Sequence, residues 1–261
     1  MVALSIIIPA YNEEKRIERT LVEYCEFFKQ KTAFDIHVII NGCVDDTIGV
    51  VKKISKKYKQ INYVDIGNVG SKGAAVNYGF KIAEGGLIGF VDADLATKPD
   101  AFYDMVKAID EDENVDGVIA SRWIKGARYD KNKIGFFHIF AGRSFNLIAN
   151  SFFNLRIKDT QCGAKLFRKD AIKIVCKELG ITRWAFDVDL LYQMKRHKFK
   201  VKEIPTEWSE PGGSHLKVKP TVVIEMFLAL LRLRLIYSPF KFIVKIYDML
   251  PRRLHIGEIV K

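Results

Sequence analysis

The chain has 261 residues, of which 42 are Lys or Arg and 31 are Asp or Glu, so its formal net charge is +11. Its length predicts one large domain with a sizeable core, which excludes a short peptide or a small disulfide scaffold. The 4 cysteines show no CxxC spacing and no signal peptide precedes the first apolar run, so we expect a reducing, cytoplasmic setting.

Short apolar runs alternate with amphipathic segments through the first half of the chain, a pattern typical of an α/β domain with a mostly parallel sheet. Strands are predicted at 4–8, 36–40, 61–66, 87–92 and 117–121. Helices are predicted at about 13–31 and 45–58, from about 73, and at 98–110. Ligands of such sheets bind outside the carboxyl ends of the strands, so the residues that follow each strand are expected to converge on one edge.

One predicted strand ends in the stretch FVDADLAT at 90–97, with two carboxylates one residue apart. Asp92 and Asp94 would lie on the same side of a continuing strand, where like charges raise each other's pKa unless a cation lies between them. Mg²⁺ and Mn²⁺ prefer carboxylate oxygens and commonly bridge to substrate phosphates, so the pattern predicts a metal and diphosphate site. An Asp-x-Asp that simply opens a loop is the alternative.

The stretch NVGSKGAAVNYG at 68–79 indicates a phosphate-bearing ligand. Gly70 and Gly73 permit close backbone approach, Lys72 supplies a cation, and the next helix presents free amide groups at its N-terminus. The spacing fits neither a Walker A loop nor a GxGxxG fingerprint, and a glycine-rich turn that only caps a helix is the alternative.

The C-terminal part of the chain is both basic and apolar. Residues 195–261 hold fourteen Lys and Arg against six Asp and Glu. This combination favours an anionic membrane surface over DNA as a partner. Charged residues interrupt the apolar run too often for a comfortable membrane span, and a helix predicted to begin at Ser238 and Pro239 is amphipathic. We therefore expect a catalytic domain at 1–217 and surface-bound helices at 218–261, with a helix packed on its own domain as the alternative.

Several motifs together resemble the family 2 glycosyltransferases, and within them the dolichyl-phosphate glucose and mannose synthases, the glucose branch in particular. The motifs are PAYNEE at 9–14, GSKGAA at 70–75, VDADLAT, and above all DTQCGAKLF at 159–167 and RWAFDVDLLY at 183–192. The resemblance covers about residues 4–216. It implies an α/β GT-A fold, a Rossmann-like mostly parallel sheet flanked by helices, with C-terminal amphipathic membrane-associated helices. It also implies metal-dependent, inverting sugar transfer.

Carried over to this sequence, the resemblance implies a donor site at the ends of the first strands. The nucleotide-sugar residues would be Pro9, Ala10, Tyr11, Glu13, Asn41, Lys72, Gly73, Asp92, Ala93 and Asp94. Asp94, with Asp92 beside it, would hold Mg²⁺ or Mn²⁺. Asn41 stands where the family often has Asp, and an amide can still read a base edge because it both donates and accepts hydrogen bonds. Ala96 stands where the related mannose synthases have a metal-binding Gln, so the donor base and the third metal ligand stay open.

The resemblance also implies an acceptor site and a sugar pocket. Arg122 and Arg143 would bind the acceptor phosphate, which suits guanidinium forks, while Ser214 and His215 belong to a loop that could close over the diphosphate. The sugar pocket would comprise Asp159, Gln161, Trp184, Asp187 and Asp189. The catalytic set would be Asp94, Asp187, Arg122 and Arg143. Surface ion pairs for the arginines, a structural turn for DTQCG and a core position for the tryptophan are the alternatives.

These inferences predict a peripheral enzyme that moves a hexose, glucose in the first instance, from a UDP-sugar to dolichyl or polyprenyl phosphate at the cytoplasmic face of a cell or ER-type membrane. A lipid phosphate is already an oxyanion, so positioning and charge neutralisation should dominate, and Asp187 should orient groups more than remove a proton. Transfer of N-acetylglucosamine or mannose, transfer to a sugar hydroxyl with Asp187 as the base, a catalytically silent binding module and homo-oligomerisation stay open. Nucleic-acid binding is not expected.

Overall fold

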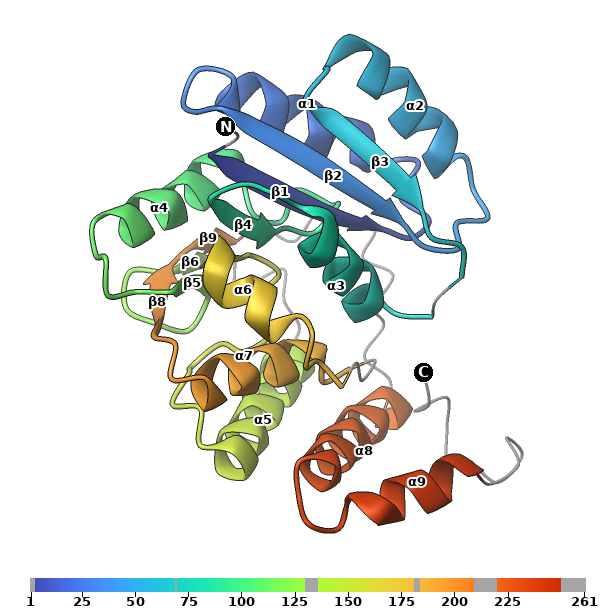
Figure 1. Cartoon of the computed structure of the whole chain (residues 1–261), viewed down its shortest axis with the longest axis vertical. Helices are drawn as coiled ribbons and strands as arrows, with labels where there is room; N and C mark the ends of the chain where they lie inside the picture. The colour runs from blue at the N-terminus through green and yellow to red at the C-terminus, as the bar shows by residue number, and fades with distance from the viewer. Residues whose placement is uncertain (1–2, 69, 130–135, 181–183, 209–219, 250–261) are drawn as a thin grey trace.

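A mixed sheet of seven strands organises the residues that the computed structural model describes, which are 3–68, 70–129, 136–180, 184–208 and 220–249 (Figure 1). The strands are β1 (Leu4–Ala10), β2 (Phe34–Ile40), β3 (Ile61–Asp65), β4 (Leu87–Phe90), β5 (Gly117–Ser121), β6 (Arg128–Tyr129), β7 (Lys165–Arg168), β8 (Val201–Pro205) and β9 (Glu207–Trp208). The order in the large sheet is β3-β2-β1-β4-β7-β5-β8, and β6 pairs with β9 separately. Only β7 runs antiparallel to its neighbours in this sheet, so the predicted mostly parallel sheet is confirmed.

Helices cover both faces of the sheet (Figure 1). They are α1 (Ile17–Phe28), α2 (Thr47–Lys57), α3 (Lys72–Ile82), α4 (Pro99–Asp110), α5 (Phe136–Phe153), α6 (Lys169–Val175), α7 (Phe186–Arg196), α8 (Pro220–Ile236) and α9 (Lys241–Met249). Successive side chains of a strand point to opposite faces. Accordingly, Ile6 and Ile8 of β1 belong to one apolar cluster with α1, α2 and α4, whereas Ile7 belongs to another with α3, α6 and α7.

β1 runs one residue beyond Pro9, where the sequence pattern predicts its end. The Ala10 carbonyl accepts a hydrogen bond from the Asn41 N–H at 3.0 Å, which extends the pairing with β2. On its other side, β1 pairs with β4 only as far as Ile7. Proline has no N–H to donate, so Pro9 makes no backbone N–H bond to a neighbouring strand.

The loop between β1 and α1 is longer than the sequence predicts, because α1 begins at Ile17 and not near Glu13. Asn12 has a positive φ of 55°, and the Glu13 N–H donates to Thr47 Oγ1 at 2.8 Å. The loop is therefore bonded to the start of α2, and it keeps the PAYNEE segment at the carboxyl edge of the sheet.

α8 packs against α5 and α7, while α9 contacts α8 (Figure 1). The shared apolar cluster comprises Phe145, Ala149, Phe153, Ala185, Val188, Ala229, Leu230 and Leu233. In α9 only Val244 is buried. Its exposed apolar side chains are Phe242, Ile243, Ile246 and Met249. None of the described helices is both long and apolar enough to cross a membrane, and the predicted boundary after residue 217 lies outside the described residues.

Candidate active site

The Asp-x-Asp turn lies just beyond the carboxyl end of β4. The Asp92 carboxylate forms an ion pair with Lys72 Nζ at the start of α3. Gly163, in the loop before β7, approaches so closely that a Cβ there would overlap the Asp92 carboxylate, with Asp92 Cγ 2.7 Å away. The cation on one side and the glycine backbone on the other therefore fix Asp92.

Asp94 lies where its charge is unfavourable. Burial and the neighbouring Asp92 carboxylate raise the pKa of Asp94 above its ordinary value. The Ala96 N–H, 3.0 Å from Asp94 Oδ1, and the Arg16 guanidinium act in the opposite direction. This is the condition that the sequence predicts for paired carboxylates, and a bound cation would relieve it.

The N-terminus of α3 meets the N-terminus of α7. Ser71 caps α3 by accepting a hydrogen bond from the Ala74 N–H at 3.2 Å. A Cβ at Gly73 would lie 2.5 Å from Phe186 Cγ, so only glycine allows α3 to pack on the first residue of α7. Asn41, which is predicted to face the donor base, donates its Nδ2–H to the Ser71 carbonyl at 2.9 Å and so holds the cap in place.

Two ammonium groups lie near the ring of Phe90, the last residue of β4. Lys72 Nζ is 5.6 Å and Lys165 Nζ is 5.3 Å from the ring centroid. Lys165 is fully buried and donates to Asp187 Oδ1 at 2.6 Å. Burial works against the charge of Lys72, but the carboxylates of Asp92 and Asp187 outweigh it and raise the pKa of Lys72. Sequence reasoning missed Lys165, although a charged residue inside the apolar strand of the DTQCGAKLF motif is a readable signal.

Arg122 and Arg143 approach the same tryptophan. Arg122 donates from Nε and Nη2 to the two oxygens of Asp159 at 2.8 and 2.9 Å. Burial disfavours the guanidinium charge, but Asp159 outweighs it and raises the pKa of Arg122. The guanidinium carbons of Arg122 and Arg143 lie 5.4 and 5.1 Å from the Trp123 ring centroid. Buried Asp159 thus braces Arg122, and Trp123, which the sequence analysis did not single out, lies against both cations.

A cleft of about 580 Å³ opens beside Arg143. Arg156 and Lys158, which sequence reasoning also missed, line it together with Arg143. Asn146 in its wall donates to the carbonyls of Ile157 and Lys158 at 3.0 and 2.7 Å, which ties α5 to the loop that carries the cations. The lining is therefore positively charged and suited to an anion.

Asp189, predicted for the sugar pocket, lies away from this group. It is fully buried and accepts hydrogen bonds from the Gly180 N–H and from Tyr237 Oη, both at 2.6 Å. Residues two apart on a helix face different sides, so Asp189 faces Tyr237 at the end of α8, while Asp187 contacts Lys165 of β7.

Trp184 and Gln161 serve the packing between loops and helices. Trp184 Nε1 donates to Glu225 Oε2 of α8 at 3.2 Å, and the ring packs against the α5, α7 and α8 cluster. Gln161 Nε2 donates to the Trp184 carbonyl at 3.4 Å. These contacts match the core alternative for the tryptophan.

The PAYNEE segment borders the same edge of the sheet as the Asp-x-Asp turn. The Tyr11 ring is 61% exposed and is open to a ligand. Glu13 accepts two hydrogen bonds from Arg16, both at 2.7 Å. The Ala93 carbonyl accepts from Thr20 Oγ1 at 2.7 Å, which anchors the turn on α1. Ser214 and His215 lie outside the described residues.

The described residues contain no group of three or more His, Cys, Asp and Glu side chains arranged to hold a metal ion. Asp92 and Asp94 nevertheless fit a divalent ion as a partial ligand set. Their oxygens are the donors that Mg²⁺ and Mn²⁺ prefer, and burial together with the Asp92 carboxylate raises the pKa of Asp94, which a bound cation would counteract. A substrate diphosphate and water would have to supply the other ligands.

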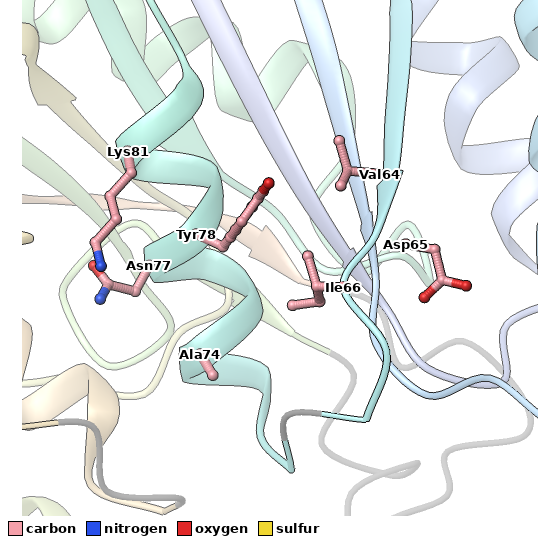
Figure 2. Close-up of a pocket in the computed structure, with 7 residues that line it drawn as sticks. All are labelled: Val64, Asp65, Ile66, Ala74, Asn77, Tyr78 and Lys81. Carbon is pink, nitrogen blue, oxygen red and sulfur yellow. The ribbon is translucent and has the colours of Figure 1, made fainter.

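A second groove, of about 410 Å³, lies between α3 and β3 (Figure 2). Figure 2 shows Asn77 and Tyr78 leaving α3 on different sides, with Asp65 directed away from the helix. Its polar groups therefore do not converge on one point, in contrast to those around Asp92.

A sheet of this topology with charged groups at its carboxyl edge is the framework of a nucleotide-binding enzyme. The sequence profile described as Glycosyl transferase family 2 matches residues 5–175, which include β1 to β7 and the Asp-x-Asp turn. The match covers more than half of the chain, so the chain belongs to this family, and the predicted family is confirmed.

Relatives of this chain carry more specific names. A dolichyl-phosphate beta-glucosyltransferase of Trichomonas vaginalis is 35% identical over 247 residues, which cover 90% of this chain and 74% of the relative. The enzyme of that name from Drosophila melanogaster is 35% identical over 230 residues, covering 82% and 69% of the two chains. The one from Homo sapiens is 31% identical over 224 residues, with the same 82% and 69% coverage.

Solved structures share the fold at low sequence identity. Glucosyl-3-phosphoglycerate synthase from Mycobacterium tuberculosis, with Mn²⁺, UDP and glucosyl-3-phosphoglycerate bound, gives a TM-score of 0.61 at 14% identity, covering 89% of this chain and 80% of that chain. S. aureus TarS 1–349 in complex with UDP-GlcNAc gives a TM-score of 0.58 at 19% identity, covering 91% and 68%. These similarities concern the fold, and they agree with the expected GT-A-like sheet.

Proposed function

We propose that this chain transfers glucose from UDP-glucose to dolichyl or polyprenyl phosphate, with inversion at the anomeric carbon and with Mg²⁺ or Mn²⁺ as cofactor. One observation carries the proposal. Carboxylates with a lysine occupy one part of the sheet edge, after β4, whereas two arginines on a common tryptophan occupy the part after β5. Such an arrangement has separate places for a metal-bound diphosphate and for a second phosphate.

On the donor side, Asp92 and Asp94 are the residues that would hold the metal ion, and Lys72 lies next to them at the start of α3. The bound metal would neutralise charge on the departing nucleoside diphosphate. The free N–H groups at the start of α3 and the Lys72 ammonium favour phosphate oxygens at the same place. Asp187, which accepts a hydrogen bond from Lys165 Nζ at 2.6 Å, would contact the sugar.

On the acceptor side, the reaction needs orientation more than proton removal. A phosphate monoester is ionised near neutral pH, so its oxygen can attack the anomeric carbon without a base. Arg122, braced by Asp159, and Arg143, placed on Trp123, are suited to hold that phosphate through bidentate hydrogen bonds. The positively charged cleft beside Arg143 provides room for the phosphate end of the lipid.

The exposed face of α9 supports attachment to a membrane surface. Phe242 is 53% exposed and Ile246 58% exposed, beside the exposed cations Lys241 and Lys245. An apolar face flanked by lysines binds the interface of anionic bilayers, where a lipid acceptor would be found.

The proposal is tested with purified protein in detergent, polyprenyl phosphate and Mn²⁺ or Mg²⁺, in separate reactions with UDP-glucose, UDP-N-acetylglucosamine and GDP-mannose. Lipid products are measured by mass spectrometry, with Asp94→Asn and a chelator as controls. We expect a hexosyl-phosphoryl lipid from UDP-glucose, and little product in either control. A product from another donor would reassign the sugar, and no glycosyl lipid with any donor would refute the acceptor class.

A further inference from the structure

Lys165 places a positive charge inside the protein. Its side chain has no exposed surface, and it lies in β7 opposite Phe90 of β4 and Ile119 of β5. A buried ammonium strongly destabilises a fold unless it is paired and hydrogen-bonded. The groups that contact the Lys165 ammonium therefore indicate its role.

Three groups surround the Lys165 ammonium. It donates to the Cys162 carbonyl at 2.7 Å and to Asp187 Oδ1 at 2.6 Å, and it lies 5.3 Å from the Phe90 ring centroid. The carbonyl belongs to the loop before β7, the carboxylate to the first turn of α7, and the ring to the end of β4. Lys165 thus links the Asp-x-Asp edge to the helix that carries Asp187.

This pairing fixes the direction of the Asp187 carboxylate. One oxygen is bonded to an ammonium that cannot rotate away, because the Cys162 carbonyl and the Phe90 ring hold that ammonium in turn. The Asp187 side chain keeps 15% of its surface exposed. A ligand hydroxyl can reach the carboxylate there, and an oriented carboxylate is a strong hydrogen-bond acceptor.

We propose that Lys165 is a positioning residue that orients Asp187 toward the donor sugar, so that the pair binds the hexose and does not deprotonate the acceptor. The inference rests on the proposed function. It suits an acceptor that is already anionic, because such an acceptor needs no general base and leaves the Asp187 carboxylate to bind the sugar.

The test compares the binding of UDP-glucose with that of UDP, with Mn²⁺ present, by isothermal titration calorimetry. The proteins are the wild type, Lys165→Met, Asp187→Asn and the double variant. Only the glucose would contact Asp187. We therefore expect each single variant to bind UDP-glucose about tenfold more weakly and UDP unchanged, as for one lost hydrogen bond to a charged group.

The double variant separates positioning from fold stability. It contains neither charge, so its thermal stability should recover relative to Asp187→Asn, which leaves the fully buried Lys165 ammonium without its carboxylate. If Lys165 acts through Asp187, the double variant should bind UDP-glucose about tenfold more weakly than the wild type, as each single variant does. Two independent effects would instead multiply to about a hundredfold. If Asp187→Asn does not fold, Lys165→Met and the double variant still supply the comparison. Lys169→Met, which removes a surface lysine paired with Glu84 at 2.6 Å, is the matched control and should bind both ligands as the wild type does.

The inference would be overturned by equal weakening of UDP and UDP-glucose binding, or by recovery of UDP-glucose affinity together with stability in the double variant. A wild type that binds both ligands equally would also overturn it, because Asp187 would then make no sugar contact. Transfer to polyprenyl phosphate by the same wild-type protein is measured in parallel. Failure of that reaction alone would refute the proposed acceptor and leave the binding result in force.

Discussion

Adding one methyl group at Gly163 tests whether the position of the Asp92 carboxylate controls the reaction. In Gly163→Ala the new Cβ would lie 2.7 Å from Asp92 Cγ and closer still to a carboxylate oxygen. Contacts below 3.0 Å are essentially never seen for a real Cβ, so the carboxylate has to retreat by about 1 Å.

The expected effect on activity is large and the effect on stability small. A displacement of about 1 Å at a reacting centre can lower the rate about 100-fold, which corresponds to about 2.7 kcal/mol. The Asp92 side chain is 34% exposed, so the displaced carboxylate stays in contact with water and the free energy of unfolding should change by less than about 1 kcal/mol. Lys72 would lose its partner at the same time.

The assay measures kcat/KM for UDP-glucose with polyprenyl phosphate, together with thermal unfolding. Gly142→Ala in α5 is the control, because a Cβ there meets nothing within 4 Å. We expect the control to keep its activity. Wild-type kcat/KM in Gly163→Ala, or loss of activity only in proportion to lost folded protein, would refute the reasoning.

Three other perturbations test separate parts of the structure. Trp123→Leu should raise the KM for polyprenyl phosphate about tenfold and Trp123→Phe less, since cation–π contacts contribute about 0.5–2 kcal/mol each; an equal rise in the KM for UDP-glucose would contradict this. Burial raises the pKa of the Cys162 thiol to about 11, so its alkylation by iodoacetamide should be slow at pH 8 and keep rising until about pH 11. Mass spectrometry should find partly exposed Cys43 labelled first, and equal labelling at pH 8 would contradict the assignment. Phe242→Glu should weaken sedimentation with anionic vesicles, whereas Ile174→Glu, at an exposed site on α6, should not; unchanged binding by the first variant would exclude α9 as the membrane contact.

The ends of the parallel strands could be predicted from sequence because their signal is local. An apolar run followed by Asp92 and Asp94 predicts both a buried strand and a pair of carboxylates at its carboxyl end. The region after β5 is different, since β7 enters the middle of the sheet from a distant part of the chain. The periodicity of a sequence does not predict that a strand will insert antiparallel between two others. The position of Lys165 in the sheet and its contact with Asp187 therefore could not be predicted from the sequence.

Residues of one motif can have partners in different parts of the fold. Asp187 and Asp189 lie together in RWAFDVDLLY, yet the helical turn separates them, and Asp189 bonds to Tyr237 at the end of α8. Trp184 likewise has its partner in α8, because its Nε1–H donates to Glu225. In both cases the deciding partner lies more than forty residues away along the sequence. Local patterns carry no information about such partners.

The central position of β7 has a consequence for biosynthesis. β4 and β5 do not pair with each other, because each pairs with residues 165–168 between them. While the chain is being made, β1 to β4 can assemble early, but β4 keeps an open edge until β7 has emerged. Open edges recruit strands from other chains, so this interval is the one in which a chaperone would be needed. Pairing of β7 brings the carboxylate side of the active site next to the arginine side, so we expect the site to form only after β7 has joined the sheet.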